Sequence, residues 1–310
     1  MAIAFVFPGQ GSQQIGMGKA LADNFKSARA VFDEVDEALG EKLSTIIWEG
    51  PEDQLTLTAN TQPALLAVSI AVLRALEEAK GLKITDAKFV AGHSLGEYSA
   101  LCAAGALSLT DAARLLRVRG NAMQEAVPVG VGGMAALIGT TPEQAAEIVA
   151  EAAGGDVLAV ANDNGGGQVV VSGHKAAVER AIETAKVLGV KRGVLLPVSA
   201  PFHSPLLEPA AEIMREALAL VTVNTPAPPV VANVTARAET DPATIRDLLV
   251  KQVAGTVRWR ESVAWMAGQG VTRFVELGAG KVLAGLVKRI ADGAESQSVG
   301  TPDDVAGFAG

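Results

Sequence analysis

Cysteine is almost absent from this sequence. Cys102 is the single cysteine among 310 residues, so no disulfide can form within the chain. A small secreted fold held together by disulfides is therefore excluded. Because so little cysteine is typical of proteins in a reducing compartment, we predict a cytoplasmic location.

Basic residues and long apolar runs are also scarce. Lys and Arg number 26 against 34 Asp and Glu, which gives a net charge of -8, whereas nucleic-acid binding requires clustered basic residues. No uninterrupted apolar run reaches the roughly 18 residues of a membrane-spanning helix. The apolar start of the chain lacks a basic segment and is interrupted by Pro8 and Gly9, which indicates a strand and not a signal peptide. We expect neither a nucleic acid nor a membrane as partner.

Aromatic residues make up only 4% of the chain, although hydrophobic residues make up 49%. The core must therefore consist mostly of Ala, Val and Leu. With 19% charged residues, the composition is that of a globular protein and not of a disordered one.

Strand and helix patterns alternate along much of the chain, which indicates an α/β fold with a largely parallel sheet. Strands are predicted at Ile3–Phe7, Lys88–Ala91, Val230–Thr235 and Thr272–Leu277. Helices are predicted at Gly18–Leu39, Thr61–Gly81, Glu97–Gly105, Asp111–Glu125, Pro205–Val221, Ile245–Gln252, Glu261–Gln269 and Lys281–Ala291. The last fifteen or so residues are rich in Gly, Asp and Ser, and we expect them to be loose.

The middle of the chain follows a different order, β-α-β-β-α-β, which is typical of a ferredoxin-like subdomain. Its predicted elements are Met134–Ile138, Thr141–Ala153, Val157–Ala161, Gln168–Ser172, Lys175–Leu188 and Val194–Val198. We predict that residues 127–199 form this small subdomain. It is inserted into a large, α/β-hydrolase-like domain made of residues 1–126 and 200–310.

A candidate nucleophile lies in Gly92-His93-Ser94-Leu95-Gly96, between a predicted strand and a predicted helix. This is the setting of a nucleophile elbow, in which small residues permit a sharp turn and a serine hydroxyl is held at a helix N-terminus. The bare pattern also recurs by chance, and the alternative is a purely structural turn.

The chain has only three histidines, so few residues are candidates for the general base that activates Ser94. His93 adjoins the serine, and this position indicates a supporting polar role. His174 lies at a strand-to-helix junction, which indicates a structural role. His203 lies in a loop at the return to the large domain, where catalytic groups often lie, and it is our candidate base. For an orienting carboxylate, Asp163 and Asp292 are the alternatives by chain position, but neither has a convincing context.

Other patterns carry less information. Gly9-Gln10-Gly11 opens a glycine-rich turn that fails both nucleotide-binding fingerprints, because Gln14 and Met17 replace the required Gly and Lys. Such a turn can instead offer backbone amides to an oxyanion. Arg119 lies on a basic helix face that, taken alone, is most often only solvated. No metal-ligand spacing occurs, and we expect no metal and no redox cofactor.

Taken together, these motifs resemble those of the malonyl-CoA:acyl-carrier-protein transacylases, the loading enzymes of bacterial fatty-acid synthesis. The resemblance extends over the whole chain and rests on motifs in the family's order. They are Phe7-Pro8-Gly9-Gln10-Gly11-Ser12-Gln13, Thr61-Gln62-Pro63-Ala64, Gly92-His93-Ser94-Leu95-Gly96-Glu97-Tyr98, Arg119-Gly120 with Met123-Gln124, Pro201-Phe202-His203-Ser204, and Glu276-Leu277-Gly278 with Gly280-Lys281-Val282-Leu283.

The resemblance implies a role for each matching position. Ser94 would be the nucleophile and His203 the general base, and the amides of Leu95 and Gln10 would form the oxyanion hole.

On the substrate side, the resemblance implies that Arg119 binds the free carboxylate of malonyl, with Gln62 lining the pocket beside it. Gln252 would orient His203 through its backbone carbonyl, which would replace an orienting Asp. Phe202 resembles the residue of malonyl-selective members.

The implied reaction moves a malonyl group from malonyl-CoA to the phosphopantetheine thiol of acyl carrier protein through a malonyl-serine intermediate. Three other readings share part of this pattern. A serine hydrolase would use water as the acceptor, a polyketide-synthase acyltransferase would share every catalytic residue, and a carrier-binding module would lack catalysis. The hydrolase would share Ser94 and His203, but Arg119 and the match of several motifs disfavour it. The intact set of Ser94, His203 and Arg119 disfavours the carrier-binding module.

Overall fold

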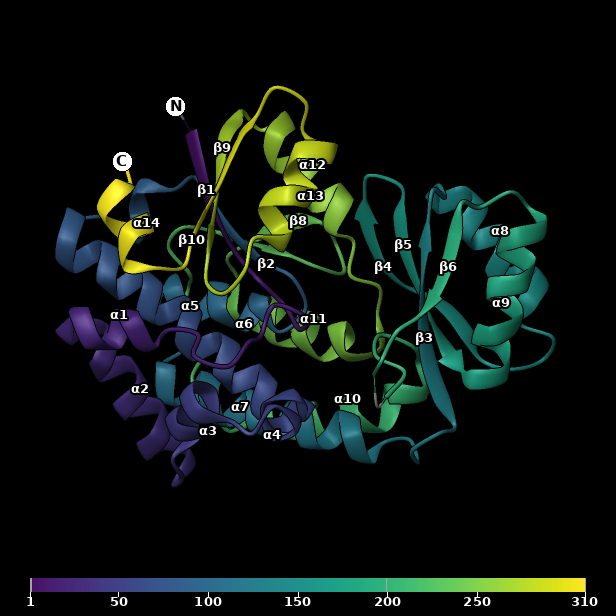
Figure 1. Ribbon diagram of the computed structural model, residues 1–310, viewed down its shortest axis with the longest axis horizontal. Coiled ribbons are helices and arrows are strands. Elements are labelled where there is room, and N and C mark those ends of the chain that lie inside the picture. Colours follow the sequence, from purple (N-terminus) through teal and green to yellow (C-terminus); the bar gives the residue numbers. More distant parts are fainter. Residues whose placement is uncertain (1, 199, 310) are drawn as a thin grey trace.

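The larger of two sheets forms the centre of the molecule. The computed structural model describes residues 2–198 and 200–309. In this sheet the strands lie in the order β10 (Glu295–Val299), β9 (Val271–Leu277), β1 (Ala2–Phe7), β2 (Phe89–Gly92), β7 (Val230–Ala232) and β8 (Arg237–Glu239). All neighbouring pairs are parallel except β7 and β8 (Figure 1). The predicted parallel α/β sheet is confirmed.

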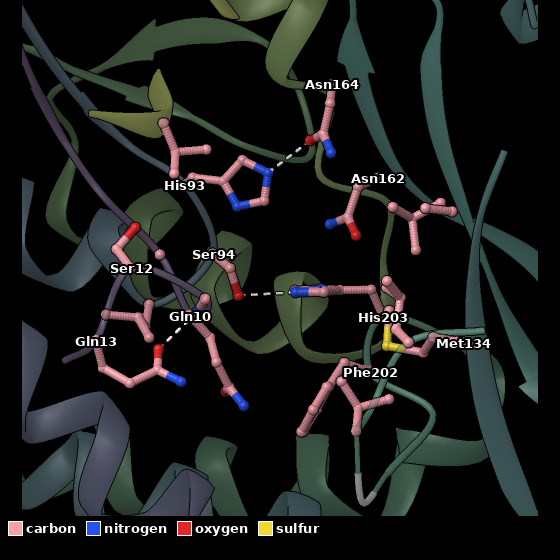
Figure 2. A pocket seen from close by; sticks show the side chains of 18 of the residues that line it. Gln10, Ser12, Gln13, His93, Ser94, Met134, Asn162, Asn164, Phe202 and His203 are labelled. Carbon is pink, nitrogen blue, oxygen red and sulfur yellow. Dashed lines mark hydrogen bonds between the residues drawn. The ribbon is translucent and has the colours of Figure 1, made fainter. Parts of the chain in front are cut away.

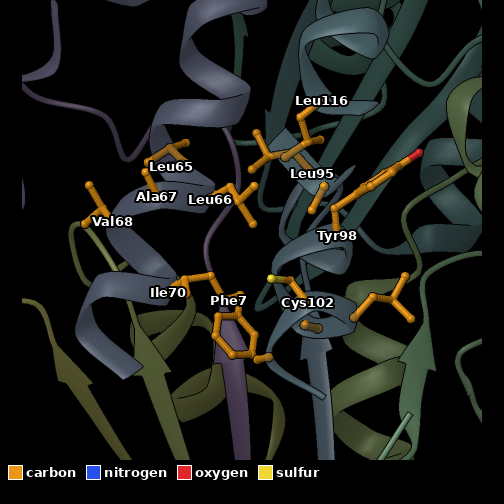
Figure 3. Packing of buried hydrophobic residues seen from close by; sticks show 14 of the residues in the cluster. Phe7, Leu65, Leu66, Ala67, Val68, Ile70, Leu95, Tyr98, Cys102 and Leu116 are labelled. Carbon is orange, nitrogen blue, oxygen red and sulfur yellow. The ribbon is translucent and has the colours of Figure 1, made fainter. Parts of the chain in front are cut away.

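Strand β1 shows how this sheet is buried on both faces. Its residues Ala4, Phe5, Val6 and Phe7 are fully buried. Because successive side chains point to opposite faces, Phe5 and Phe7 enter one apolar cluster while Ala4 and Val6 enter another. Figure 3 shows Phe7 among the apolar side chains of the two neighbouring helices. Strand β1 is therefore an inner strand of the sheet, with a separate apolar cluster packed on each of its faces.

Helices cover both faces of the large sheet. They are α1 (Lys19–Asn24), α2 (Lys26–Leu39), α3 (Leu43–Glu49), α4 (Glu52–Thr56), α5 (Thr58–Lys80), α6 (Gly96–Ala103), α7 (Leu109–Glu125), α10 (Glu208–Ala219), α11 (Pro242–Ala254), α12 (Trp259–Gly268), α13 (Val282–Ile290) and α14 (Pro302–Gly307). By length and composition alone α5 could cross a membrane, but 89% of its most apolar window is buried inside the protein. Such burial is typical of a core helix.

The second sheet is antiparallel and stands beside the first (Figure 1). Its strands lie in the order β4 (Leu158–Gly165), β5 (Gln168–His174), β3 (Gly132–Ile138) and β6 (Arg192–Leu195), with α8 (Pro142–Ala152) and α9 (Lys175–Val187) on its outer face. This order confirms the predicted ferredoxin-like arrangement. The boundaries at residues 127 and 199 stay a prediction.

The small sheet is hydrogen-bonded to the chain segment that follows α11. The Val257 amide donates to the Ala161 carbonyl at 2.9 Å, and the Asp163 amide donates to the Val257 carbonyl at 3.0 Å. The Thr256 hydroxyl adds a bond of 2.6 Å to the Val160 carbonyl. Segment 256–257 thus extends β4 at its edge and connects the two sheets.

Two of the predicted elements were wrong in their extent. Phe25 has an extended backbone that divides the predicted helix Gly18–Leu39 into α1 and α2; the apolar pattern conceals this break because Phe25 packs against the core in any case. The predicted strand Val230–Thr235 ends at Ala232 and turns into β8, with Ala236 at a φ of 54°.

The C-terminal segment is ordered, contrary to expectation. Strand β10 pairs with β9, and Thr301 begins α14 with a capping box in which the Thr301 and Asp304 side chains bond each other's amides. The polar composition of β10 suits an edge strand, and the spacing from Thr301 to Asp304 is the signal that could have predicted the helix.

Candidate active site

Ser94 lies at the sharp turn between β2 and α6, with a φ of 53°. The turn requires glycine on both sides. A β-carbon on Gly92 would lie 1.8 Å from the Gly96 carbonyl oxygen, and one on Gly96 would lie 2.3 Å from the Phe7 carbonyl oxygen. A non-glycine residue in this left-handed region costs on the order of 1–3 kcal/mol and is most often found at functional sites. The predicted nucleophile-elbow geometry is therefore present.

The Ser94 hydroxyl faces the ring of His203 (Figure 2), with 2.7 Å between Oγ and Nε2. The other ring nitrogen, Nδ1, lies 2.9 Å from the Gln252 carbonyl oxygen and 3.1 Å from the Gly255 carbonyl oxygen. Carbonyl oxygens only accept hydrogen bonds, so Nδ1 carries the proton and Nε2 is free to accept from Ser94. Like Ser94, His203 has a positive φ, of 57°.

Burial keeps the His203 ring neutral. Burial, as the largest cause, and the nearby charge of Arg119 together lower the pKa of His203 to about 3, although the hydrogen bonds to the Gln252 and Gly255 carbonyls oppose the shift. A neutral imidazole is the form that can take a proton, so His203 can act as a general base at neutral pH.

Two backbone amides beside Ser94 are available for an oxyanion. Within the described residues, the amides of Leu95 and Gln10 donate no hydrogen bond, and both residues line the cavity in front of Ser94. Leu95 immediately precedes the first turn of α6, where the helix dipole adds to the attraction for negative charge. The Gln10 side chain is held by the Thr58 hydroxyl, which donates to Oε1 at 3.0 Å.

Arg119 reaches the same point from α7. Its guanidinium is 1% exposed and donates to Gln62 Oε1 at 2.7 Å, to Gln252 Oε1 at 2.9 Å and to Ser94 Oγ at 3.2 Å. Its Nε has no hydrogen-bond partner, and no carboxylate in the described residues forms an ion pair with it. A buried arginine that has no carboxylate in direct contact is costly, which makes this a site for an anionic group. From the sequence alone, the helix face that carries Arg119 was most simply interpreted as solvated. The structure shows that this interpretation was wrong for Arg119.

Sequence reasoning missed Asn233. Its Oδ1 accepts from the Ser94 amide at 2.8 Å, and its Nδ2 donates to the Gly92 carbonyl at 2.7 Å, so its side chain holds the elbow on both sides of the turn. A signal was available, because Asn233 follows a strand that is parallel to the strand before Ser94. The carboxyl ends of such strands meet at one edge.

The other sequence candidates lie further from the reacting atoms. His93 Nε2 lies 2.8 Å from Asn164 Oδ1, so it bonds across to the small sheet and not to Ser94 (Figure 2). His174 Nδ1 accepts from the Val157 amide at 3.0 Å, within the small sheet. Asp163 pairs with Arg260 at 2.8 Å. The histidine orienter is thus a pair of backbone carbonyls, not a carboxylate.

The site opens into a cavity of about 450 Å³ between the two sheets. The small sheet contributes alternate residues of its inner face, which are Met134, Ala136, Asn162, Asn164, Gln168 and Val170. Phe202 is buried next to His203 and narrows the cavity beside the base (Figure 2). Residues 2–198 and 200–309 contain no group of three or more His, Cys, Asp and Glu side chains that could hold a metal ion.

Comparison with known proteins agrees with this site. The acyl transferase domain family matches residues 4–307. A malonyl CoA-acyl carrier protein transacylase of Bacillus subtilis is 48% identical over 98% of this chain and 95% of its own. The crystal structure of an acyl-carrier-protein S-malonyltransferase from Bartonella henselae has 57% identity, a TM-score of 0.97, and coverage of 99% of this chain and 98% of its own.

A further solved structure is a complex of a malonyl transacylase with the acyl carrier protein of a type II polyketide synthase. It has 42% identity, a TM-score of 0.95, and coverage of 99% of this chain and 98% of its own. These matches extend over nearly the whole length of both partners. The chain belongs to the acyl transferase domain family and is an acyltransferase.

Proposed function

We propose that this enzyme transfers the malonyl group of malonyl-CoA to the phosphopantetheine thiol of acyl carrier protein, and so supplies malonyl carrier protein for fatty-acid synthesis. The observation that carries this proposal is the environment of Arg119. A permanently charged guanidinium is buried beside the nucleophile, and no carboxylate of the described residues is in direct contact with it. Malonyl differs from acetyl by one carboxylate, and a guanidinium can bind both of its oxygens with parallel hydrogen bonds.

The first half-reaction acylates Ser94. His203 Nε2 takes the hydroxyl proton while Oγ attacks the thioester carbonyl of malonyl-CoA, and the amides of Leu95 and Gln10 bind the oxyanion that forms. When the carbonyl reforms, the carbon–sulfur bond breaks. The sulfur leaves with the proton from His203 as the thiol of CoA, and malonyl-Ser94 remains.

The second half-reaction reverses the roles. The carrier-protein thiol gives its proton to His203 and attacks the Ser94 ester through its sulfur. Breaking the ester bond returns the proton to Ser94 Oγ and leaves malonyl on the carrier. The curated relatives carry the name of this reaction, and one similar solved structure contains a carrier protein. A polyketide-synthase carrier would be an acceptor of the same chemistry.

The proposal places the enzyme in the cytoplasm, a reducing compartment in which its single cysteine, Cys102, stays reduced. The acidic net charge of -8 supports the expectation that nucleic acid and anionic membrane surfaces are not its partners.

Arg119→Ala tests the proposed function. We expect malonyl transfer to fall and acetyl transfer to be spared or raised, so that the malonyl-to-acetyl ratio drops at least about tenfold, since charge-assisted hydrogen bonds contribute about 1.5–3 kcal/mol each. Arg119→Lys should recover only part of the ratio, because an ammonium lacks the planar fork. Intact-mass measurement of acylation with malonyl-CoA and acetyl-CoA gives the ratio.

Arg117→Ala is the matched control for that variant. Arg117 lies on the same helix but bonds outward to Asn60 and Glu41, so its removal should leave the ratio unchanged. If Arg119→Ala lowers both acyl transfers equally, Arg119 is structural and the malonyl assignment loses its physical support.

Phe202→Ser tests selectivity at the α-carbon of the substrate. Phe202 is 8% exposed and lies beside the base, so we expect its ring to block a methyl branch on the substrate. The variant should therefore raise methylmalonyl transfer relative to malonyl transfer. One methyl group discriminates by about 1–3 kcal/mol, so we expect a relaxed and not an inverted preference. Competition between the two CoA esters measures the ratio, and an unchanged ratio removes Phe202 from the selectivity argument.

A further inference from the structure

A second buried charge lies beside the site and has no part in the mechanism above. Glu97 is on α6, three residues after the nucleophile, and is 2% exposed. Its Oε2 accepts from the Asn233 amide at 2.9 Å and from Gln252 Nε2 at 2.8 Å. Ionisable side chains are almost never buried this deeply without a specific purpose or partner.

The Gln252 side chain connects this carboxylate to Arg119. Its Nε2 donates to Glu97 and its Oε1 accepts from Arg119 Nη2 at 2.9 Å. The amide therefore lies between the two charges, with its donor end toward the carboxylate and its acceptor end toward the guanidinium. Because Arg119 forms no direct ion pair in the described part of the chain, Glu97 is the carboxylate whose charge offsets it through this amide.

Glu97 can exist in either protonation state near neutral pH. Burial raises the pKa of Glu97 to about 7, although the hydrogen bonds from Asn233 and Gln252 and the charge of Arg119 lower it. The other titratable group that faces both charges is Tyr98. Burial raises the pKa of Tyr98 to about 12, so it remains neutral. A second negative charge brought to Arg119 repels the Glu97 carboxylate and favours its protonated form.

We propose that Glu97 is a specificity-determining residue that exchanges its negative charge for that of the acyl group. Its carboxylate offsets Arg119 before substrate binds, and it takes up a proton from solvent when a carboxylate-bearing acyl group pairs with Arg119. This inference rests on the proposed function, since it requires that the acyl group carry a carboxylate. A neutral acyl group leaves Glu97 ionised as before.

A dependence of acyl selectivity on pH follows. Below its pKa Glu97 is protonated and Arg119 is free to pair with the acyl carboxylate. Above the pKa of Glu97, the acyl carboxylate must bind beside the negative charge of the ionised Glu97. The malonyl-to-acetyl ratio of Ser94 acylation should therefore fall by up to about tenfold between about pH 6 and about pH 8, the limit set by the protonated fraction of a group that titrates near pH 7. Titration of His203 and of CoA affects both substrates and cancels in the ratio.

Glu97→Gln should make this ratio independent of pH. A glutamine can still accept from the Asn233 amide and Gln252 through its Oε1, so the variant removes the charge and keeps the hydrogen bonds. Glu276→Gln is the matched control. Glu276 is also a buried carboxylate with a raised pKa, but its oxygens accept from the Leu283 and Ala284 amides. The control should keep the pH dependence of the wild type.

Proton uptake tests the inference on the wild-type enzyme, even if Glu97→Gln does not fold. In a lightly buffered solution with a pH indicator, acylation by malonyl-CoA near pH 7 should take up about half a proton more per enzyme than acylation by acetyl-CoA. Equal uptake from the two esters, or a pH-dependent ratio that survives in Glu97→Gln, overturns the inference alone. Absence of any malonyl adduct on Ser94 overturns the proposed function instead.

Discussion

Enzyme carrying Ser94→Ala should form no covalent adduct with malonyl-CoA, and its transfer rate should fall by roughly 10⁴-fold or more. The reason is geometric: Ser94 Oγ is the hydroxyl that lies 2.7 Å from His203 Nε2 and 3.2 Å from Arg119 Nη2. Intact-mass analysis after mixing with malonyl-CoA reports the adduct directly, and thermal unfolding checks that the variant is folded.

Ser99→Ala provides the matched control for this variant. Ser99 is a buried serine of the same helix α6, and its hydroxyl has no hydrogen-bond partner among residues 2–198 and 200–309. Its loss should change neither the adduct nor the rate. A malonyl adduct on Ser94→Ala protein would show that acylation occurs elsewhere, and the mechanism would then be wrong.

His203→Ala should slow acylation of Ser94 by roughly 10²–10⁴-fold, the usual contribution of a positioned base. Stopped-flow release of CoA measures this step. His174→Gln is the control, because His174 is bound within the small sheet and should leave the rate unchanged. An equal loss in both variants would mean that the loss reflects general damage and not the removal of a base.

The pH profile of the wild type tests the same role. Because the pKa of His203 is lowered to about 3, its neutral, active form persists well below neutral pH. Acylation by acetyl-CoA, which involves no acyl carboxylate, should therefore be nearly flat between about pH 5 and about pH 7. A fall in rate with a midpoint near pH 6.5, the ordinary value for histidine, would contradict a buried neutral base.

The sequence was sufficient to predict the residues that change chemically during the reaction. Ser94 was predictable because the elbow needs Gly92 and Gly96 at fixed positions next to it. His203 was predictable because the chain contains so few histidines. These are local or compositional signals, and the family resemblance added Arg119. The structure brings all three together within hydrogen-bonding distance.

The groups that support them could not be predicted in the same way. Two carbonyl oxygens, of Gln252 and Gly255, accept hydrogen bonds from the His203 ring. The family resemblance implied the Gln252 carbonyl, but residue identity alone does not show which backbone carbonyl is an acceptor, and the Gly255 carbonyl was not predicted. Asn233 bonds Ser94 across 139 positions of sequence. Glu97 is informative only once its burial is known, since a glutamate in the first turn of a helix is otherwise an ordinary exposed residue.

The hydrogen bonds between β4 and segment 256–257 have a consequence for how such enzymes can be recombined. The carbonyls that orient His203 belong to Gln252 and Gly255, and Val257, two residues further on, is bonded on both sides to the edge of β4. The small sheet and its two helices therefore cannot be exchanged without affecting the position of His203. A chimaera that takes the small sheet from a relative must therefore keep the hydrogen-bond register between β4 and segment 256–257, as well as the cavity wall. Otherwise the transplanted small sheet would bring the acyl selectivity of its own cavity wall, but it would displace His203, the base needed for transfer of any acyl group.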